Sequence, residues 1–379
     1  MRSAFILLLI VAGGLRIIEG TISEAPAGPP LEIRIDGSPD PGVMKRIQEI
    51  CVDFPSLERR RTSRFEILSD LDDETIGEHR QWLERTVHAV EDFCRYLGYE
   101  IERLPQGRER HLVLAFSNRD DFLRFALKHD KVNATWLAGY FSPAAGHLVY
   151  HTAANHPDVQ RITHRIGPAE RSEDQEPRQD IRRQLDRFVV QADASVVVHE
   201  ATHMLLHHHG VAPATTRQPM WLLEGLAGSF EPAEASRRFG PMRPENGRTR
   251  DFRRLLREDR VPVLSDLIRE QDFTHARRDT QAQYATSAAF CSWLVRYRPR
   301  EFRRFLDHVN RRIPKEDVVM AMVGMDETAR EPKSAEVDWL ADFEDVFGDI
   351  EVMEKVWLRS ERAAAALPVA NGADTKSLE

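Results

Sequence analysis

The sequence predicts an α+β protein, in which a small mixed sheet and a long helix are followed by an α-helical lobe. Segments with the composition of short strands all lie before residue 152. Apolar residues recur at helical spacing from about residue 185 to residue 358. The 379 residues are enough for two lobes rather than one. Strands and helices followed by helices alone indicate an α+β lobe joined to a helical lobe.

The N-terminus has the features of an export signal. A positively charged start precedes an apolar run from Ala4 to Leu15, which is shorter than the roughly 20 residues of a membrane span. We assign residues 1–20 to a signal peptide and 21–30 to a Pro-rich linker, and expect a periplasmic, cell-envelope or extracellular protein. Because no clear cleavage site follows, an uncleaved N-terminal anchor is the alternative, and no other contact with a membrane is expected.

The first lobe is predicted to span residues 31–210. Alternating or β-branched apolar residues predict short strands, and longer stretches with helical spacing predict helices at 74–97 and 120–128. A charged stretch with several prolines, 155–183, is predicted to be a long surface loop. The predicted strands are 31–35, 65–68, 111–116, 139–141 and 147–151.

The second lobe, residues 211–362, is predicted to be helical, and residues 363–379 to be a disordered tail. The formal net charge is -8, and basic residues are interleaved with acidic ones. That pattern is typical of a solvated surface and argues against a nucleic-acid partner. The three cysteines include no CxxC pair, so we expect no thiolate metal site.

The strongest chemical signal is His199-Glu200-x-x-His203, which lies in an apolar, helical stretch. Residues four apart share one face of a helix, so both histidines can bind one metal ion. Zinc held by three protein ligands keeps a position for water, and Glu200 lies where it can accept the proton of that water. We therefore expect zinc ligands at His199 and His203 and a general base at Glu200.

The third ligand is expected to be Glu224. It lies in a second apolar helix after Pro219, where a carboxylate without a partner would be costly to bury. The competing ligand is His209, which would complete a metzincin-like spacing. That spacing requires a glycine where this chain has Leu206, because the helix must break there. Gly210 is instead expected to cap a helix that continues past Leu206.

The two motifs, HExxH and the later Trp-x-x-Glu-Gly-Leu-Ala, resemble those of the gluzincins, the thermolysin-like clan of zinc metallopeptidases. Within that clan the chain looks most similar to a poorly characterised bacterial family of unknown function, over roughly residues 64–297. The resemblance implies a zincin-like fold with a strand beside the cleft, zinc ligation by His199, His203 and Glu224, and Glu200 as base. Many gluzincins have an acidic residue four positions after the ligand glutamate, but this chain has Gly228, which leaves the partner of the zinc ligands undefined. Weaker marks of the resemblance are Phe65 to Asp70, Gly139 to Phe141, and Tyr284.

An amide hydrolase also needs a hydrogen-bond donor for the oxyanion that develops during attack. Tyr284 and His275 are candidates for that donor, and a Tyr packed in a helix is the alternative interpretation of Tyr284. The segment His147 to His151 is our candidate for the strand whose unpaired edge aligns an extended peptide.

These observations lead us to expect a secreted or envelope zinc-dependent peptidase that hydrolyses peptide or protein substrates. One alternative is a zinc-binding protein of the same fold without proteolytic activity. The other is a helical interaction module in which the histidines are incidental. The sequence indicates neither the oligomeric state nor the identity of the substrate.

Overall fold

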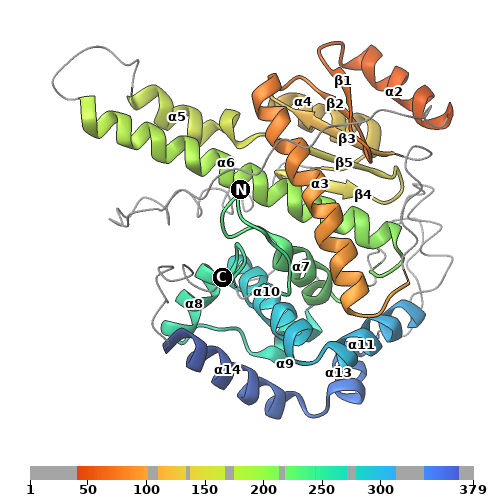
Figure 1. Ribbon diagram of the computed structural model, residues 1–379, viewed down its shortest axis with the longest axis vertical. Helices are drawn as coiled ribbons and strands as arrows, with labels where there is room; N and C mark the ends of the chain where they lie inside the picture. Colours follow the sequence, from red (N-terminus) through yellow and green to blue (C-terminus); the bar gives the residue numbers. More distant parts are fainter. Residues whose placement is uncertain are drawn as a thin grey trace, which may run out of the picture.

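The computed structural model describes residues 41–100, 110–133, 137–166, 175–212, 218–243, 245–270, 273, 279–312 and 337–366. One lobe contains the sheet and its covering helices, and the second lobe consists of helices (Figure 1). This arrangement confirms the predicted α+β class with a helical lobe. The predicted signal peptide, linker and first strand fall outside the described residues.

The sheet has five strands in the order β1-β2-β3-β5-β4. Its two outer pairs are antiparallel and its two inner pairs are parallel, so the sheet is mixed, as predicted. β4 pairs only with β5 among the described residues and forms one edge. The strands are β1 (Glu58–Arg61), β2 (Phe65–Ser69), β3 (His111–Phe116), β4 (Gly139–Ser142) and β5 (His147–His151).

Helices cover both faces of the sheet. Side chains along β3 therefore alternate between two hydrophobic cores, one on each face. Val113 and Ala115 belong to the core shared with α3 (Asp73–Tyr96) and α6 (Gln175–His208). The intervening β3 side chains, including Leu114, face the opposite way, because successive strand residues alternate between faces. That second core is completed by α2 (Pro41–Asp53), α4 (Arg119–Phe125) and the π-helical turn η1 (Ala126–Asp130).

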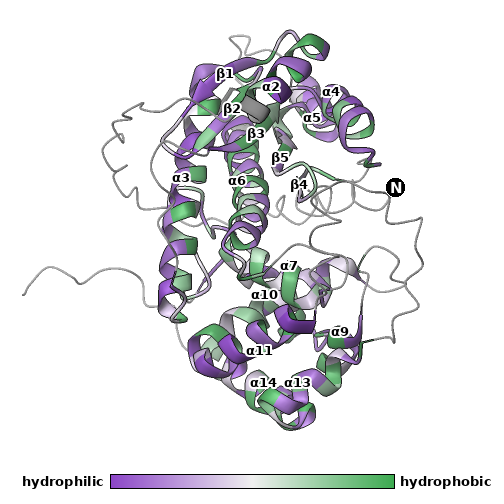
Figure 2. Ribbon diagram, turned by 90° about the vertical axis from the view of Figure 1, so that its right-hand side faces the viewer, coloured by the Kyte–Doolittle hydropathy of each residue, from purple (hydrophilic) through white to green (hydrophobic). Residues whose placement is uncertain are grey.

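α6 is the central element of the molecule, because it contacts the sheet on one side and α3 on another (Figure 2). It does not break at Leu206, and it ends at His208. Gly210 follows with a positive φ of 64°, and its N–H donates to the carbonyl of His207. The predicted glycine cap is therefore confirmed. No helix in the described residues has the length and apolar character to cross a membrane.

The prediction of a surface loop at 155–183 is wrong. The 3-10 turn η2 (Ala153–Asn155), α5 (Pro157–Ile166) and the first residues of α6 occupy most of this stretch. α5 and the first part of α6 project together from the body of the lobe (Figure 1). A projecting helix needs few large apolar residues, and pairs such as Arg183 with Asp180 support it from the helix surface.

In the helical lobe, α10 (Thr280–Tyr297) lies at the centre and packs closely against α7 (Met220–Phe230). Their backbones meet at Gly225, where a Cβ atom would lie 2.6 Å from the carbonyl oxygen of Ser287. α14 ends at Ala366, so the first residues of the predicted disordered tail are helical. The helices are α7 (Met220–Phe230), α8 (Thr249–Arg257), α9 (Leu264–Arg269), α10 (Thr280–Tyr297), α11 (Pro299–Arg312), α13 (Trp339–Phe347) and α14 (Ile350–Ala366).

Candidate metal centre

Two helices from different lobes bring three metal-ligating side chains together. His199 and His203 lie one turn apart on α6, and Glu224 reaches them from α7. The Nε2 atom of His199 is 3.1 Å from both the Nε2 atom of His203 and the Oε2 atom of Glu224. The other carboxylate oxygen of Glu224 is 3.7 Å from Nε2 of His203. Among the described residues, these three form the group whose ligand atoms all lie within 4.8 Å of one another.

The spacing of these atoms fits a tetrahedral metal ion. Zinc–nitrogen and zinc–oxygen bonds of about 2.0–2.2 Å place neighbouring tetrahedral ligands roughly 3.3–3.6 Å apart. The observed separations of 3.1, 3.1 and 3.7 Å lie close to that range. The three ligand atoms therefore lie close enough together to bind one cation.

Glu231 fixes the orientation of His199. Its Oε1 atom lies 2.9 Å from Nδ1 of His199 and also accepts hydrogen bonds from the guanidinium of Arg248. A proton on Nδ1 that is donated to Glu231 leaves the Nε2 lone pair of His199 directed at the other two ligands. The carboxylate partner that the sequence left undefined is therefore Glu231, at the end of α7.

Sequence reasoning missed Glu231 and Arg248 because they stand outside the usual spacing. The expected position, Gly228, is closely packed, since a Cβ atom there would lie 3.2 Å from Ala288 and 3.7 Å from the Arg248 side chain. The only signal available in the sequence was the seven-residue interval from Glu224 to Glu231. That interval returns to nearly the same face of a helix.

The electrostatics of the site favour a positive charge at its centre. Burial alone would lower the pKa of His199, but hydrogen bonds to Glu224 and Glu231 outweigh burial and raise it to about 10. Burial likewise opposes ionisation of Glu224, yet the charge of His203 and the hydrogen bonds from both histidines hold its pKa far below the ordinary value. Because the carboxylates draw a proton onto His199, a cation bound at the same atoms would be stabilised in the same way.

Glu200 lies beside the ligands on α6 but outside the ligand set. Its Oε2 atom accepts a hydrogen bond of 3.1 Å from the backbone N–H of Phe141, on the edge strand β4. Burial raises the pKa of Glu200, although the positive charges of His199 and His203 oppose that effect. A carboxylate with a raised pKa beside a metal site takes up a proton more readily than an ordinary glutamate, as a general base must.

Tyr284 is brought to the centre from α10. Its ring centroid lies 6.4 Å from that of His199, and the guanidinium carbon of Arg248 lies 5.5 Å from the Tyr284 centroid. Burial first, and then the negative charge of Glu224, raise the pKa of the Tyr284 hydroxyl, so it stays protonated as a hydrogen-bond donor. The other predicted donor, His275, lies outside the described residues.

His209, the competing ligand that the sequence disfavours, lies outside the ligand group, because its backbone N–H donates to the Leu205 carbonyl and the helical turn continues past Leu206. One expectation is corrected by the structure. His147 to His151 is β5, which is paired on both sides by β3 and β4 and so has no free edge. The strand with an edge beside α6 is β4, and the paired histidines of β5 are core residues rather than a peptide-binding surface.

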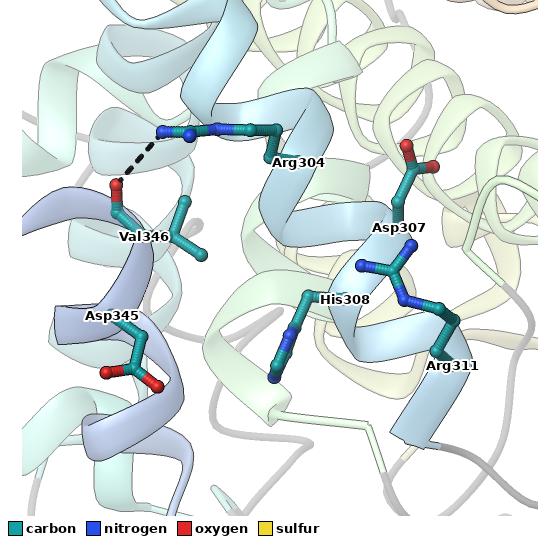
Figure 3. A pocket seen from close by; sticks show the side chains of 6 residues that line it. All are labelled: Arg304, Asp307, His308, Arg311, Asp345 and Val346. Atoms are coloured by element: carbon teal, nitrogen blue, oxygen red, sulfur yellow. Dashed lines mark hydrogen bonds between the residues drawn. The ribbon is translucent and has the colours of Figure 1, made fainter.

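A separate hollow with a volume of about 230 Å³ lies between α11 and α13 in the helical lobe (Figure 3). Arg304 donates to the Val346 carbonyl across it, at 3.4 Å. None of its lining residues belongs to the metal group, and we assign the hollow no part in the chemistry. It is lined by Arg304, Asp307, His308, Arg311, Asp345 and Val346.

Comparison with known proteins gives one family match, and the matched segment includes the candidate centre. No curated protein matches the chain. Residues 193–316, which run from α6 past the end of α11 and include His199, His203 and Glu224, contain a domain that matches the family described as a protein of unknown function (DUF1570).

Proposed function

We propose that the protein is a zinc-dependent peptidase of the gluzincin type. The observation that carries this proposal is the convergence of His199, His203 and Glu224, with Glu200 adjacent to the ligands but not one of them. Three protein ligands and a neighbouring carboxylate are the side chains that metal-assisted amide hydrolysis needs. Zinc bound here would polarise the scissile carbonyl and lower the pKa of a water molecule.

The chain's own residues would then perform the remaining steps. Glu200 accepts the proton of the attacking water and returns it to the leaving amine. Tyr284, held protonated beside Glu224, donates a hydrogen bond to the oxygen that becomes negative during attack. Glu231 keeps His199 in the tautomer and orientation that ligation requires.

The substrate class follows from the position of β4. An edge strand has backbone groups without a ladder partner, and an extended peptide can pair with such an edge. β4 contacts the helix that carries His199 and His203, so a peptide aligned along it would pass near the ligand group. We therefore propose peptides or proteins as substrates, with export of the protein directed by residues 1–20.

The decisive experiment combines metal analysis with hydrolysis of a quenched fluorescent peptide library. Wild-type protein should contain close to one zinc ion per chain, and Glu224→Ala should lose most of it. Glu200→Gln should retain zinc and lose hydrolysis by about a hundredfold or more. His209→Ala is the matched control and should retain both.

The alternatives make different predictions in the same experiment. Zinc without hydrolysis of any peptide would support a non-proteolytic zinc protein, and absence of metal would support an interaction module. Cell fractionation tests the proposed export separately. Full-length protein, with Met1 retained, in the soluble cytoplasmic fraction would contradict export.

A further inference from the structure

We infer that the backbone amide of Phe141 is a positioning group for Glu200, an inference that rests on the proposed role of Glu200 as base. The Phe141 nitrogen lies 3.1 Å from Oε2 of Glu200. A hydrogen bond from a backbone N–H to a carboxylate is charge-assisted, and therefore stronger than one between neutral groups. It also connects the side chain of the base to an element other than its own helix.

The amide is available because β4 is an edge strand. Among the described residues β4 pairs with β5 alone, so the N–H groups on its other side have no ladder partner. A strand paired on both sides, such as β3 or β5, could not offer an amide to a side chain on α6. The strand edge that is proposed to face substrate thus also supplies the contact to Glu200.

Two close packing contacts between β4 and α6 accompany this hydrogen bond. Gly139 packs so closely that a Cβ atom there would lie 2.9 Å from Val196, and the Phe141 ring centroid lies 5.4 Å from that of His207. Val196, Glu200 and His207 are separated by four and seven residues, which places them on one stripe of the helix. β4 therefore runs along this stripe of α6. The bond from the Phe141 amide to Glu200 lies between the packing contacts at Val196 and His207.

The opposite face of β4 is also anchored. The hydroxyl of Tyr140 donates to Oδ2 of Asp130 at 2.6 Å, and Nε2 of His147 lies 2.7 Å from the same oxygen. The Asp130 side chain is only 2% exposed, so this anchor is protected from water. With both faces of the strand held, the Phe141 amide is a fixed reference point for the Glu200 carboxylate. Fixing a reacting group in this way acts on turnover more than on substrate affinity.

Amide hydrogen exchange tests the contact without any measurement of activity. In zinc-loaded protein labelled with ¹⁵N-phenylalanine, the Phe141 amide should exchange slowly, although it lies on a sheet edge. Glu200→Ala should accelerate its exchange at least about tenfold, because the acceptor is gone. The Phe116 amide, in the inner strand β3, is the internal control and should not change. Equal exchange of Phe141 in both proteins would overturn the inference.

Replacement of the Phe141 amide by an ester, through incorporation of phenyllactic acid, tests whether the hydrogen bond to Glu200 affects turnover. The ring is kept, the N–H is lost and the Tyr140 carbonyl becomes a weaker acceptor, so zinc content and KM should stay within about twofold while kcat falls about tenfold to a hundredfold. The same replacement at Val52, on α2 at the opposite face of the sheet, controls for the general effect of an ester. Unchanged kcat in the Phe141 ester, beside an inactive Glu200→Gln protein, would overturn the positioning inference alone. A fully active Glu200→Gln protein would overturn the proposed function itself.

Discussion

Glu231 supports the metal centre from outside the ligand set, through a single hydrogen bond to His199. Glu231→Gln preserves the shape of the side chain and removes its charge, so Nδ1 of His199 loses its charged partner and Arg248 loses its ion pair with Glu231. We expect zinc affinity to fall about tenfold to a hundredfold, as measured by competition with a chelating dye. Glu234→Gln, at an exposed residue just beyond α7, is the control. An unchanged affinity in Glu231→Gln would show that His199 does not depend on this partner.

The variant Tyr284→Phe tests whether the Tyr284 hydroxyl beside Glu224 acts in turnover or in packing. Tyr284→Phe removes only the hydroxyl, and a donor to the oxyanion acts more strongly in the transition state than on bound substrate. We expect kcat to fall by about a hundredfold, with zinc content and KM nearly unchanged. Tyr297→Phe, at an exposed position of the same helix, should behave like wild type. A lower melting temperature with normal kcat would make Tyr284 a core residue instead.

At the scale of elements, the junction of α7 and α10 depends on Gly225. A methyl group at this position would overlap the backbone of Ser287 and approach Sγ of Cys291, at 2.9 Å, so the helices would have to separate. Gly225→Ala should destabilise the protein by about 1–3 kcal/mol, with a lower midpoint in urea unfolding. Gly77→Ala is the matched control, because nothing lies within 4 Å of its added methyl group. It should instead stabilise α3 by about 0.5–1 kcal/mol. Similar unfolding midpoints for the two variants would contradict this account of the junction.

Elements with an apolar pattern could be predicted, and elements built from charged residues could not. α3, β3 and β5 bury a regular set of apolar side chains, and their predicted bounds agree closely with the structure. β1 has the sequence Glu-Arg-Arg-Arg, and arginines from it pair with the fully buried Glu66. Its strand character depends on a tertiary partner that no local pattern reveals.

The residues of the candidate site likewise divide into those that could be predicted from the sequence and those that could not. His199, His203 and Glu224 were predictable because helix geometry alone brings the first two together and burial demands a partner for the third. The Glu231 contact and the Phe141 amide depend on how α7 ends and on where β4 crosses α6. Such contacts between separate elements become visible only when the fold is assembled.

For the whole molecule, buried histidines predict sensitivity to acid. His151 is 3% exposed, and burial lowers its pKa from 6.5 to about 4. The native state keeps the ring neutral where the unfolded chain binds a proton, so stability is lost as the pH falls from about 6.5 towards 4. Each such group should reduce the unfolding free energy by on the order of 2 kcal/mol at pH 5 relative to pH 7.

Urea unfolding at pH 7 and pH 5 measures this effect. His151→Phe retains an aromatic ring beside Phe122, whose centroid lies 5.0 Å from that of His151. The variant should lose less stability than wild type between the two pH values. An equal loss in both proteins would assign the acid sensitivity to other groups, such as His111, whose pKa burial lowers to about 3.

The division of the candidate centre between two lobes also sets the order in which its residues come together during biosynthesis. Both histidines lie on α6, whereas Glu224, Glu231, Arg248 and Tyr284 all follow later in the chain. Chains are synthesised from the N-terminus, and domains generally fold as units in that order. A nascent chain that has completed α6 therefore carries a pair of histidines without the third ligand. The candidate centre is complete only after α10 has been made and has docked, so a truncated product that retains only the first lobe would lack Glu224, the third member of the ligand group.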